Sequence, residues 1–78
     1  MTYTDALQKV LNELDDIVET RSEYHSWHEA YAILKEEVDE VWDEIRMKSP
    51  SGYACTEELK QVAAVAIKAM IQLGPPIQ

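Results

Sequence analysis

A dense run of carboxylates over residues 35–44 is the part of this sequence best suited to chemistry. Six of its ten residues are acidic, namely Glu36, Glu37, Asp39, Glu40, Asp43 and Glu44. On a helix, Glu37 and Glu40 share one side. Further along the chain, Glu58 and Gln61 repeat this spacing of three residues. Like charges one turn apart destabilise a helix by about 0.2–0.5 kcal/mol per pair, so a bound cation would offset their repulsion.

The chemistry that such a cluster supports is oxygen-only metal binding. The chain has one cysteine and no pair of inward histidines, so the donor set suits Mg²⁺ or Mn²⁺ better than Zn²⁺. A magnesium ion held by a few carboxylates keeps positions open for phosphate oxygens and water. The alternative is a solvated acidic helix face, which needs no ligand, and spacing alone leaves both interpretations open.

Three helical segments are predicted to position these carboxylates. The first spans about residues 4–20, where apolar side chains recur every three or four positions and Thr4 serves as the cap. The second spans about residues 27–48, because Ser26 and Glu29 form a capping box in front of it. Its apolar stripe, which we expect to face the core, consists of Trp27, Tyr31, Leu34, Val38, Val41, Trp42 and Ile45.

The third predicted helix begins within residues 53–56 and ends at Leu73. Gly74 is the expected left-handed residue after it, and Pro75-Pro76 prevents its continuation. Its apolar arc is about 200° wide, so it needs more than one neighbouring helix. The arc contains Leu59, Val62, Ala63, Val65, Ala66, Ile67, Ala69, Met70 and Leu73. A short link predicts that the second and third helices are antiparallel neighbours, with their glutamates facing one another.

Length and charge limit the classes of function. The 78 residues form one domain, residues 1–78, with no room for a second core. A net charge of −8 argues against nucleic-acid and anionic-membrane binding. The longest apolar run, residues 62–73, is too short to cross a membrane. One cysteine and no secretory signal pattern predict a cytoplasmic protein, and the small core predicts a homo-oligomer.

The acidic run also carries a family resemblance. The stretch Glu36-Glu37-Val38-Asp39-Glu40 resembles the EExxE motif of MazG-type all-α nucleoside triphosphate pyrophosphohydrolases. In that family an ExxD motif follows on the next helix, and Glu58-Leu59-Lys60-Gln61 occupies its place after 17 residues (41–57). The flanks at residues 28–32 and 61–66 are similar to those of small phage-type and mobile-element members. The resemblance covers about residues 26–70.

The resemblance implies a metal site and an activity. The ligands to Mg²⁺ or Mn²⁺ would be Glu37, Glu40 and Glu58, with Gln61 as a neutral carbonyl ligand where the family has Asp. Glu36 would assist a water molecule from outside the metal shell. The implied reaction is Mg²⁺-dependent hydrolysis of a (d)NTP to the (d)NMP and pyrophosphate, with nucleotide-pool housecleaning as its purpose. The implied fold is an all-α antiparallel helical bundle, with three helices per chain, completed by association into a homodimer or homotetramer.

Four residues near the motif are candidates for contact with the nucleotide, namely Trp27, His28, Lys35 and Trp42. The tryptophans could stack on a base, His28 lies in the family-like flank, and Lys35 could contact a phosphate. The competing interpretations are core packing for the tryptophans, a surface or capping position for His28, and a solvated helix charge for Lys35.

Two other classes of function remain open at this point. The chain could be a non-catalytic assembly module that keeps the family scaffold, since Gln61 replaces the expected Asp. A metal titration separates this module from the enzyme. The chain could also be an acidic protein that mimics nucleic acid, in which case it would bind basic proteins with a strong salt dependence.

Overall fold

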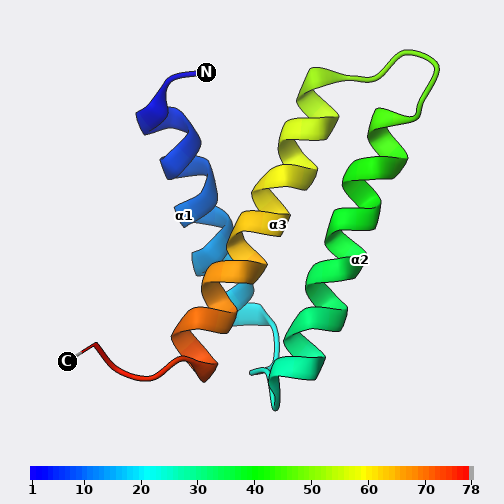
Figure 1. Ribbon diagram of the computed structural model, residues 1–78. Coiled ribbons are helices and arrows are strands. Elements are labelled where there is room, and N and C mark those ends of the chain that lie inside the picture. Colours follow the sequence, from blue (N-terminus) through cyan, green and yellow to red (C-terminus); the bar gives the residue numbers. More distant parts are fainter. Residues whose placement is uncertain (78) are drawn as a thin grey trace.

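The central element of the fold is the third helix, because both other helices pack on it. The computed structural model describes residues 1–77 and contains α1 (Tyr3–Thr20), α2 (Trp27–Ile45) and α3 (Gly52–Leu73). Figure 1 shows α3 between the other two, and within residues 1–77 neither α1 nor α2 packs on the other. The all-α prediction is confirmed, and α3 has the two neighbours that its wide apolar arc requires.

Each helix begins at a hydroxyl side chain that accepts a hydrogen bond from the first turn. Ser26 accepts from the Glu29 backbone N–H at 3.1 Å, as predicted, and Ser51 caps α3 in the same way. The Glu29 carboxylate accepts from the backbone N–H of His25 at 3.3 Å, so it closes the box one residue earlier than expected. The predicted cap at Thr4 is wrong, because Thr2 caps α1 and Thr4 lies inside the helix.

The ends of α2 and α3 differ from the predictions. The α2 helix stops at Ile45 instead of near Lys48, since Arg46 leaves helical angles (φ −78°, ψ 0°) and the Met47 N–H donates to the Glu44 carbonyl in a tighter turn. Gly74 is extended, with φ −75° and ψ 153°, because the residue before a proline avoids helical angles. The predicted left-handed conformation is therefore wrong. Glycine is required there for a close approach, since an added Cβ would lie 2.5 Å from the Met70 carbonyl oxygen.

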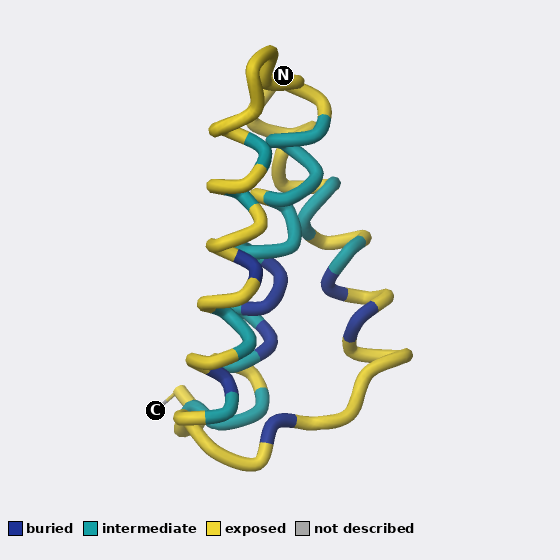
Figure 2. The backbone as a smooth tube through the Cα atoms, turned by 90° about the vertical axis from the view of Figure 1, so that its right-hand side faces the viewer, coloured by how far each residue is buried: buried dark blue, intermediate teal, exposed yellow. Residues whose placement is uncertain are grey.

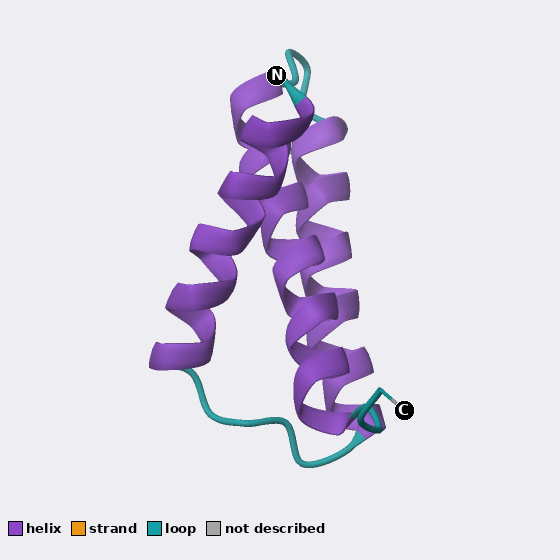
Figure 3. Cartoon of the chain, turned by 90° about the vertical axis from the view of Figure 1, so that its left-hand side faces the viewer, coloured by secondary structure: helices purple, strands orange, loops and turns teal. Residues whose placement is uncertain are grey.

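The buried core lies in the half of the molecule next to the loop at residues 21–26 (Figure 2). Its apolar members are Leu14, Ile17, Tyr24, Ala30, Ala64 and Val65. Lys68 is fully buried among them, and its Nζ donates to the Ser22 carbonyl at 2.7 Å and lies 4.2 Å from the centre of the Tyr24 ring. Figure 3 shows this loop running from the end of α1 to the start of α2. Lys68 therefore fastens the loop to α3.

Two expectations about buried faces are wrong. The α3 helix buries Ala64, Val65 and Lys68, whereas Leu59 and Met70, near the middle of its predicted apolar arc, are exposed. The tryptophans and Tyr31 of α2, expected in the core, are also more than half exposed. The reason is geometric. Helices α1 and α2 pack against the two edges of the apolar arc of α3 and leave the centre of that arc exposed. Within residues 1–77, no helix combines the length and low polarity needed to cross a bilayer.

Candidate metal centre

Three glutamates converge where α2 faces α3. Each of Glu37, Glu40 and Glu58 offers a carboxylate oxygen, and these three atoms all lie within 4.8 Å of one another. The first two come from adjacent turns of α2, and Glu58 comes from the second turn of α3. The three residues predicted from the two motifs are thus brought together by the packing of the helices.

The three glutamates differ in burial, and burial affects their pKa values. Glu37 is buried at 9% relative exposure, Glu58 is half-buried and Glu40 is exposed. Burial, followed by the adjacent Glu40 carboxylate, raises the pKa of Glu37 above its ordinary value. Burial and then Glu40 likewise raise the pKa of Glu58, with Glu44 and Glu57 adding to the effect. The folded chain therefore holds negative charges that repel one another, which is the situation that a cation relieves.

Arg21 supplies a positive charge beside the cluster. Its Nη1 atom lies 3.9 Å from Oε1 of Glu37, and its side chain remains 46% exposed. This guanidinium lowers the pKa of Glu37, against the larger effects of burial and Glu40. Sequence reasoning missed Arg21 because it lies in the loop between α1 and α2, outside both motifs. The loop holds it near α2 because Lys68 binds the next residue, Ser22.

Gln61 occupies the fourth motif position and has an unsatisfied polar atom. Its side-chain oxygen Oε1 is buried without a hydrogen-bond partner in the described part of the chain. A buried carbonyl oxygen left unpaired costs about 1–3 kcal/mol. Gln61 follows Glu58 by three residues, so the two side chains share one side of α3. Carboxylate and amide oxygens are the protein ligand atoms that Mg²⁺ prefers. The three glutamates together with Gln61 therefore fit such an ion.

Apart from Glu36, the other predicted site residues do not gather at the cluster. Lys35 pairs with Asp39 at 3.7 Å. At 100° per residue, His28, Lys35 and Trp42 lie about 140–180° around α2 from Glu37. Trp27 lies about 15 Å away along the helix axis. Glu36 is exposed on α2 beside Glu37. Glu36 precedes Glu40 by four residues, so these two side chains share one side of α2. A substrate that reached the tryptophans, His28 or Lys35 together with the cluster would have to extend around or along α2.

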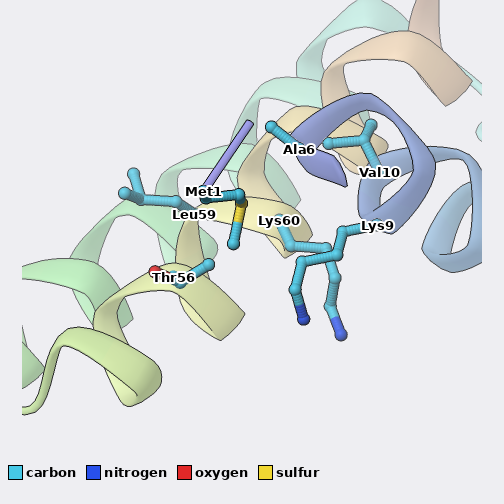
Figure 4. A pocket seen from close by; sticks show the side chains of 7 residues that line it. All are labelled: Met1, Ala6, Lys9, Val10, Thr56, Leu59 and Lys60. Atoms are coloured by element: carbon cyan, nitrogen blue, oxygen red, sulfur yellow. The ribbon is translucent and has the colours of Figure 1, made fainter. Parts of the chain in front are cut away.

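A separate groove lies between α1 and α3 on another side of the molecule. Its lining consists of Met1, Ala6, Lys9, Val10, Thr56, Leu59 and Lys60 (Figure 4). The lining is mainly apolar, and the two lysines extend side by side away from it (Figure 4). Both lysines pair with Glu57, and the hydrogen bond from Lys60 lowers the pKa of Glu57. The charges of both lysines are thus paired with Glu57. Among the residues that line this groove there is no carboxylate, histidine or cysteine that could bind a metal.

Comparison with protein-family models, with curated proteins and with solved structures finds no match to this chain.

Proposed function

We propose that the chain is a Mg²⁺-dependent nucleoside triphosphate pyrophosphohydrolase of MazG type. The observation that supports this most is the convergence of Glu37, Glu40 and Glu58 within 4.8 Å. These residues occupy the positions that the resemblance assigns to the metal ligands, and they come from two separate segments of the chain. A solvated acidic helix face does not require a glutamate of the neighbouring helix to lie beside it, whereas a shared metal ion does.

In this proposal Glu37, Glu40 and Glu58 hold the ion, and the buried Oε1 of Gln61 gains a partner on that side of α3. Bound Mg²⁺ would neutralise charge on the triphosphate and promote attack by water at phosphorus. Glu36 is exposed next to Glu37 and would accept a proton from an attacking water. The products would be a nucleoside monophosphate and pyrophosphate, released into a cytoplasmic nucleotide pool.

Arg21 would contact the triphosphate. Its guanidinium is nearly half exposed beside Glu37, and a planar guanidinium binds phosphate oxygens in pairs. A chain with a net charge of −8 repels a triphosphate, so a cation at the site has a large local effect. The pairing with Glu37 at 3.9 Å is long enough for the side chain to turn toward a phosphate without losing a short hydrogen bond.

A second candidate is a non-catalytic assembly module. It is favoured by Gln61, which leaves the ligand set one negative charge short of the family motif, and by the large apolar surface that α2 and α3 expose. In this case the glutamates would be a remnant of the scaffold and would bind metal weakly or not at all.

The decisive experiment is an assay of pyrophosphate release from each dNTP with Mg²⁺ present. We expect release by the wild-type chain and a loss of at least about 100-fold in Glu40→Gln, since one ligand charge is removed. Asp39→Asn is the matched control, because it removes the same charge from the adjacent residue, which pairs with Lys35 outside the cluster. Absence of release from the wild type, or equal release from Glu40→Gln, would contradict the enzyme and favour the module.

A further inference from the structure

Lys68 makes both of its polar contacts with the loop at residues 21–26. Its Nζ atom donates to the Ser22 carbonyl oxygen at 2.7 Å and lies 4.2 Å from the centre of the Tyr24 ring. The side chain is fully buried, and within residues 1–77 it forms no ion pair. A buried ammonium is costly unless its hydrogen bonds are made inside the protein. The loop contacts are therefore what Lys68 depends on.

Gln72 holds the same loop one turn further along α3. Its side-chain Oε1 atom accepts a hydrogen bond from the Tyr24 backbone N–H at 3.0 Å. Tyr24 is itself buried at 7% relative exposure, so the loop is packed as well as hydrogen-bonded. In Figure 1 the loop crosses next to the last turns of α3, where both residues lie. We call Lys68 and Gln72 together the loop clamp.

Arg21 begins this loop, and the course of the loop decides where its side chain lies. Its backbone N–H donates to the Ile17 carbonyl at 3.0 Å, which ties the residue to the end of α1. Helices α1 and α2 do not pack on each other within residues 1–77, so no contact between them brings Arg21 to Glu37. The next residue, Ser22, is the one that Lys68 binds. The direction in which the chain leaves α1 is therefore set from α3.

The charge of Lys68 also acts on Arg21. Burial lowers the pKa of Lys68 below its ordinary value, and the Arg21 guanidinium lowers it further, against the carboxylates of Glu29 and Glu23. The two cations are therefore close enough to repel each other. The carboxylate with which Arg21 pairs is that of Glu37, at 3.9 Å. Repulsion from Lys68 and attraction to Glu37 both favour a guanidinium that points away from the buried ammonium and toward the cluster.

We propose that Lys68 and Gln72 are positioning residues, which hold the loop at residues 21–26 so that the Arg21 guanidinium lies beside the glutamate cluster. This role goes beyond stabilising the fold, because it makes the placement of a site residue depend on two side chains of another helix. The consequence for substrate rests on the proposed function. With the loop clamp intact, the guanidinium is held where a triphosphate at the cluster would meet it, and without the clamp Arg21 is present but misplaced.

The test that needs no activity is NMR relaxation of the metal-free full chain, recorded for the backbone N–H groups of residues 21–25 and the Nε–H of Arg21. We expect backbone order parameters of about 0.85 in the wild type and below about 0.6 in Lys68→Met, with Arg21 losing order in step. Gln72→Ala, a gentler change at a half-buried position, should lower them less. Gln8→Ala is its matched control, since Gln8 donates to Asn12 at 2.8 Å on the exposed side of α1. A loop that stays ordered in both clamp variants would overturn the proposal, whether or not the chain is an enzyme.

Steady-state kinetics with a dNTP and Mg²⁺ test the consequence for the site, on variants whose circular dichroism shows them folded. We expect Lys68→Met to raise KM by about fivefold or more with little change in kcat, because a misplaced cation weakens binding. Arg21→Ala/Lys68→Met should be no worse than Arg21→Ala, since Lys68 acts through Arg21. Leu14→Ala is the control for lost stability, because it shortens a buried core side chain of α1 and removes no loop contact.

Additive losses in the double variant, or an equal rise of KM in Leu14→Ala, would overturn the positioning role and leave Lys68 a structural residue. A wild type that releases no pyrophosphate would contradict the proposed function. The loop clamp would still be supported in that case if Lys68→Met disorders the loop and Gln8→Ala does not.

Discussion

The Nη1 atom of Arg21 lies 3.9 Å from the Oε1 atom of Glu37, so a loop residue reaches the acidic cluster between α2 and α3. The guanidinium opposes the burial and the Glu40 charge that together raise the pKa of Glu37. One arginine beside three converging carboxylates leaves net negative charge in place. Arg21 therefore neutralises only part of the cluster's charge, and a metal cation could neutralise more of it.

Replacing Arg21 tests its assignment to the triphosphate. We expect Arg21→Ala to raise KM for a dNTP by about 10-fold or more, with a smaller change in kcat, because charge-assisted hydrogen bonds contribute about 1.5–3 kcal/mol. Arg21→Lys should recover part of the loss, since it keeps the charge without the bidentate geometry. The control is Arg46→Ala, whose guanidinium pairs with Asp43 instead. An unchanged KM in Arg21→Ala would restrict Arg21 to a structural role.

The raised pKa values of Glu37 and Glu58 predict a specific pH dependence without metal. A carboxyl with a raised folded pKa stabilises the fold below its ordinary value of 4.5 and loses that contribution as pH rises through the folded pKa. Glu40→Gln removes a shared cause of both shifts. In EDTA at pH 7 it should raise Tm by a few degrees, as expected for about 0.5 kcal/mol.

Thermal unfolding followed by circular dichroism between pH 4 and 8 measures this effect. The gain of Glu40→Gln over the wild type should shrink toward pH 4, where the glutamates are protonated in both states. Glu57, whose pKa is lowered by Lys60, contributes in the opposite direction and is common to both proteins. A variant less stable than the wild type at pH 7 would show that Glu40 is not under repulsion.

Some of this architecture follows from local chemistry and is therefore accessible from the sequence. The start of α2 follows from its hydroxyl cap, Ser26. The α3 helix begins at Gly52, one residue ahead of the predicted range of residues 53–56, because Ser51 caps it. The convergence of Glu37, Glu40 and Glu58 follows from two motifs on helices joined by a short link. In each case the determining residues are close in sequence, or the connection between them is too short to allow another arrangement.

The remainder depends on packing between distant segments. Periodicity identifies the apolar arc of α3 but does not show which part of it a single chain covers, so it predicts burial for Leu59 and Met70, which are exposed. The burial of Lys68 depends on a carbonyl and a ring 46 and 44 positions earlier in the chain. A lone lysine inside the apolar run of residues 62–73 is the signal that could have pointed to it. Arg21 has no local signal of this kind.

Lys68 should be a major contributor to stability. Lys68→Met keeps most of the volume and leaves the Ser22 carbonyl without its charged donor and Tyr24 without the ammonium. We expect a loss of about 1–3 kcal/mol and a Tm at least about 5 °C lower. Lys35→Met, at an exposed pair worth at most about 1 kcal/mol, is the control. Urea unfolding measures both, and a Lys68→Met variant as stable as the parent would show that burying the ammonium costs as much as its contacts return.

Placing an Asp at position 61, as in the motif that this chain resembles, should strengthen the proposed metal site. Gln61→Asp adds a carboxylate one turn from Glu58, so Mg²⁺ affinity should rise roughly tenfold, as expected when a ligand charge is added. Without metal the same variant should be less stable, because the cluster gains another negative charge. The shift of Tm between EDTA and 5 mM Mg²⁺ measures both effects. A shift no larger than that of the wild type would indicate that position 61 does not face the ion.

The most direct test of the proposed centre is calorimetric titration of the metal-free chain with Mg²⁺ and Mn²⁺. The proposal predicts one saturable site per chain in the wild type, loss of that site in Glu40→Gln and its retention in Asp39→Asn. Silence of the wild type up to millimolar metal, or equal binding by Glu40→Gln, would contradict a shared ion among Glu37, Glu40 and Glu58.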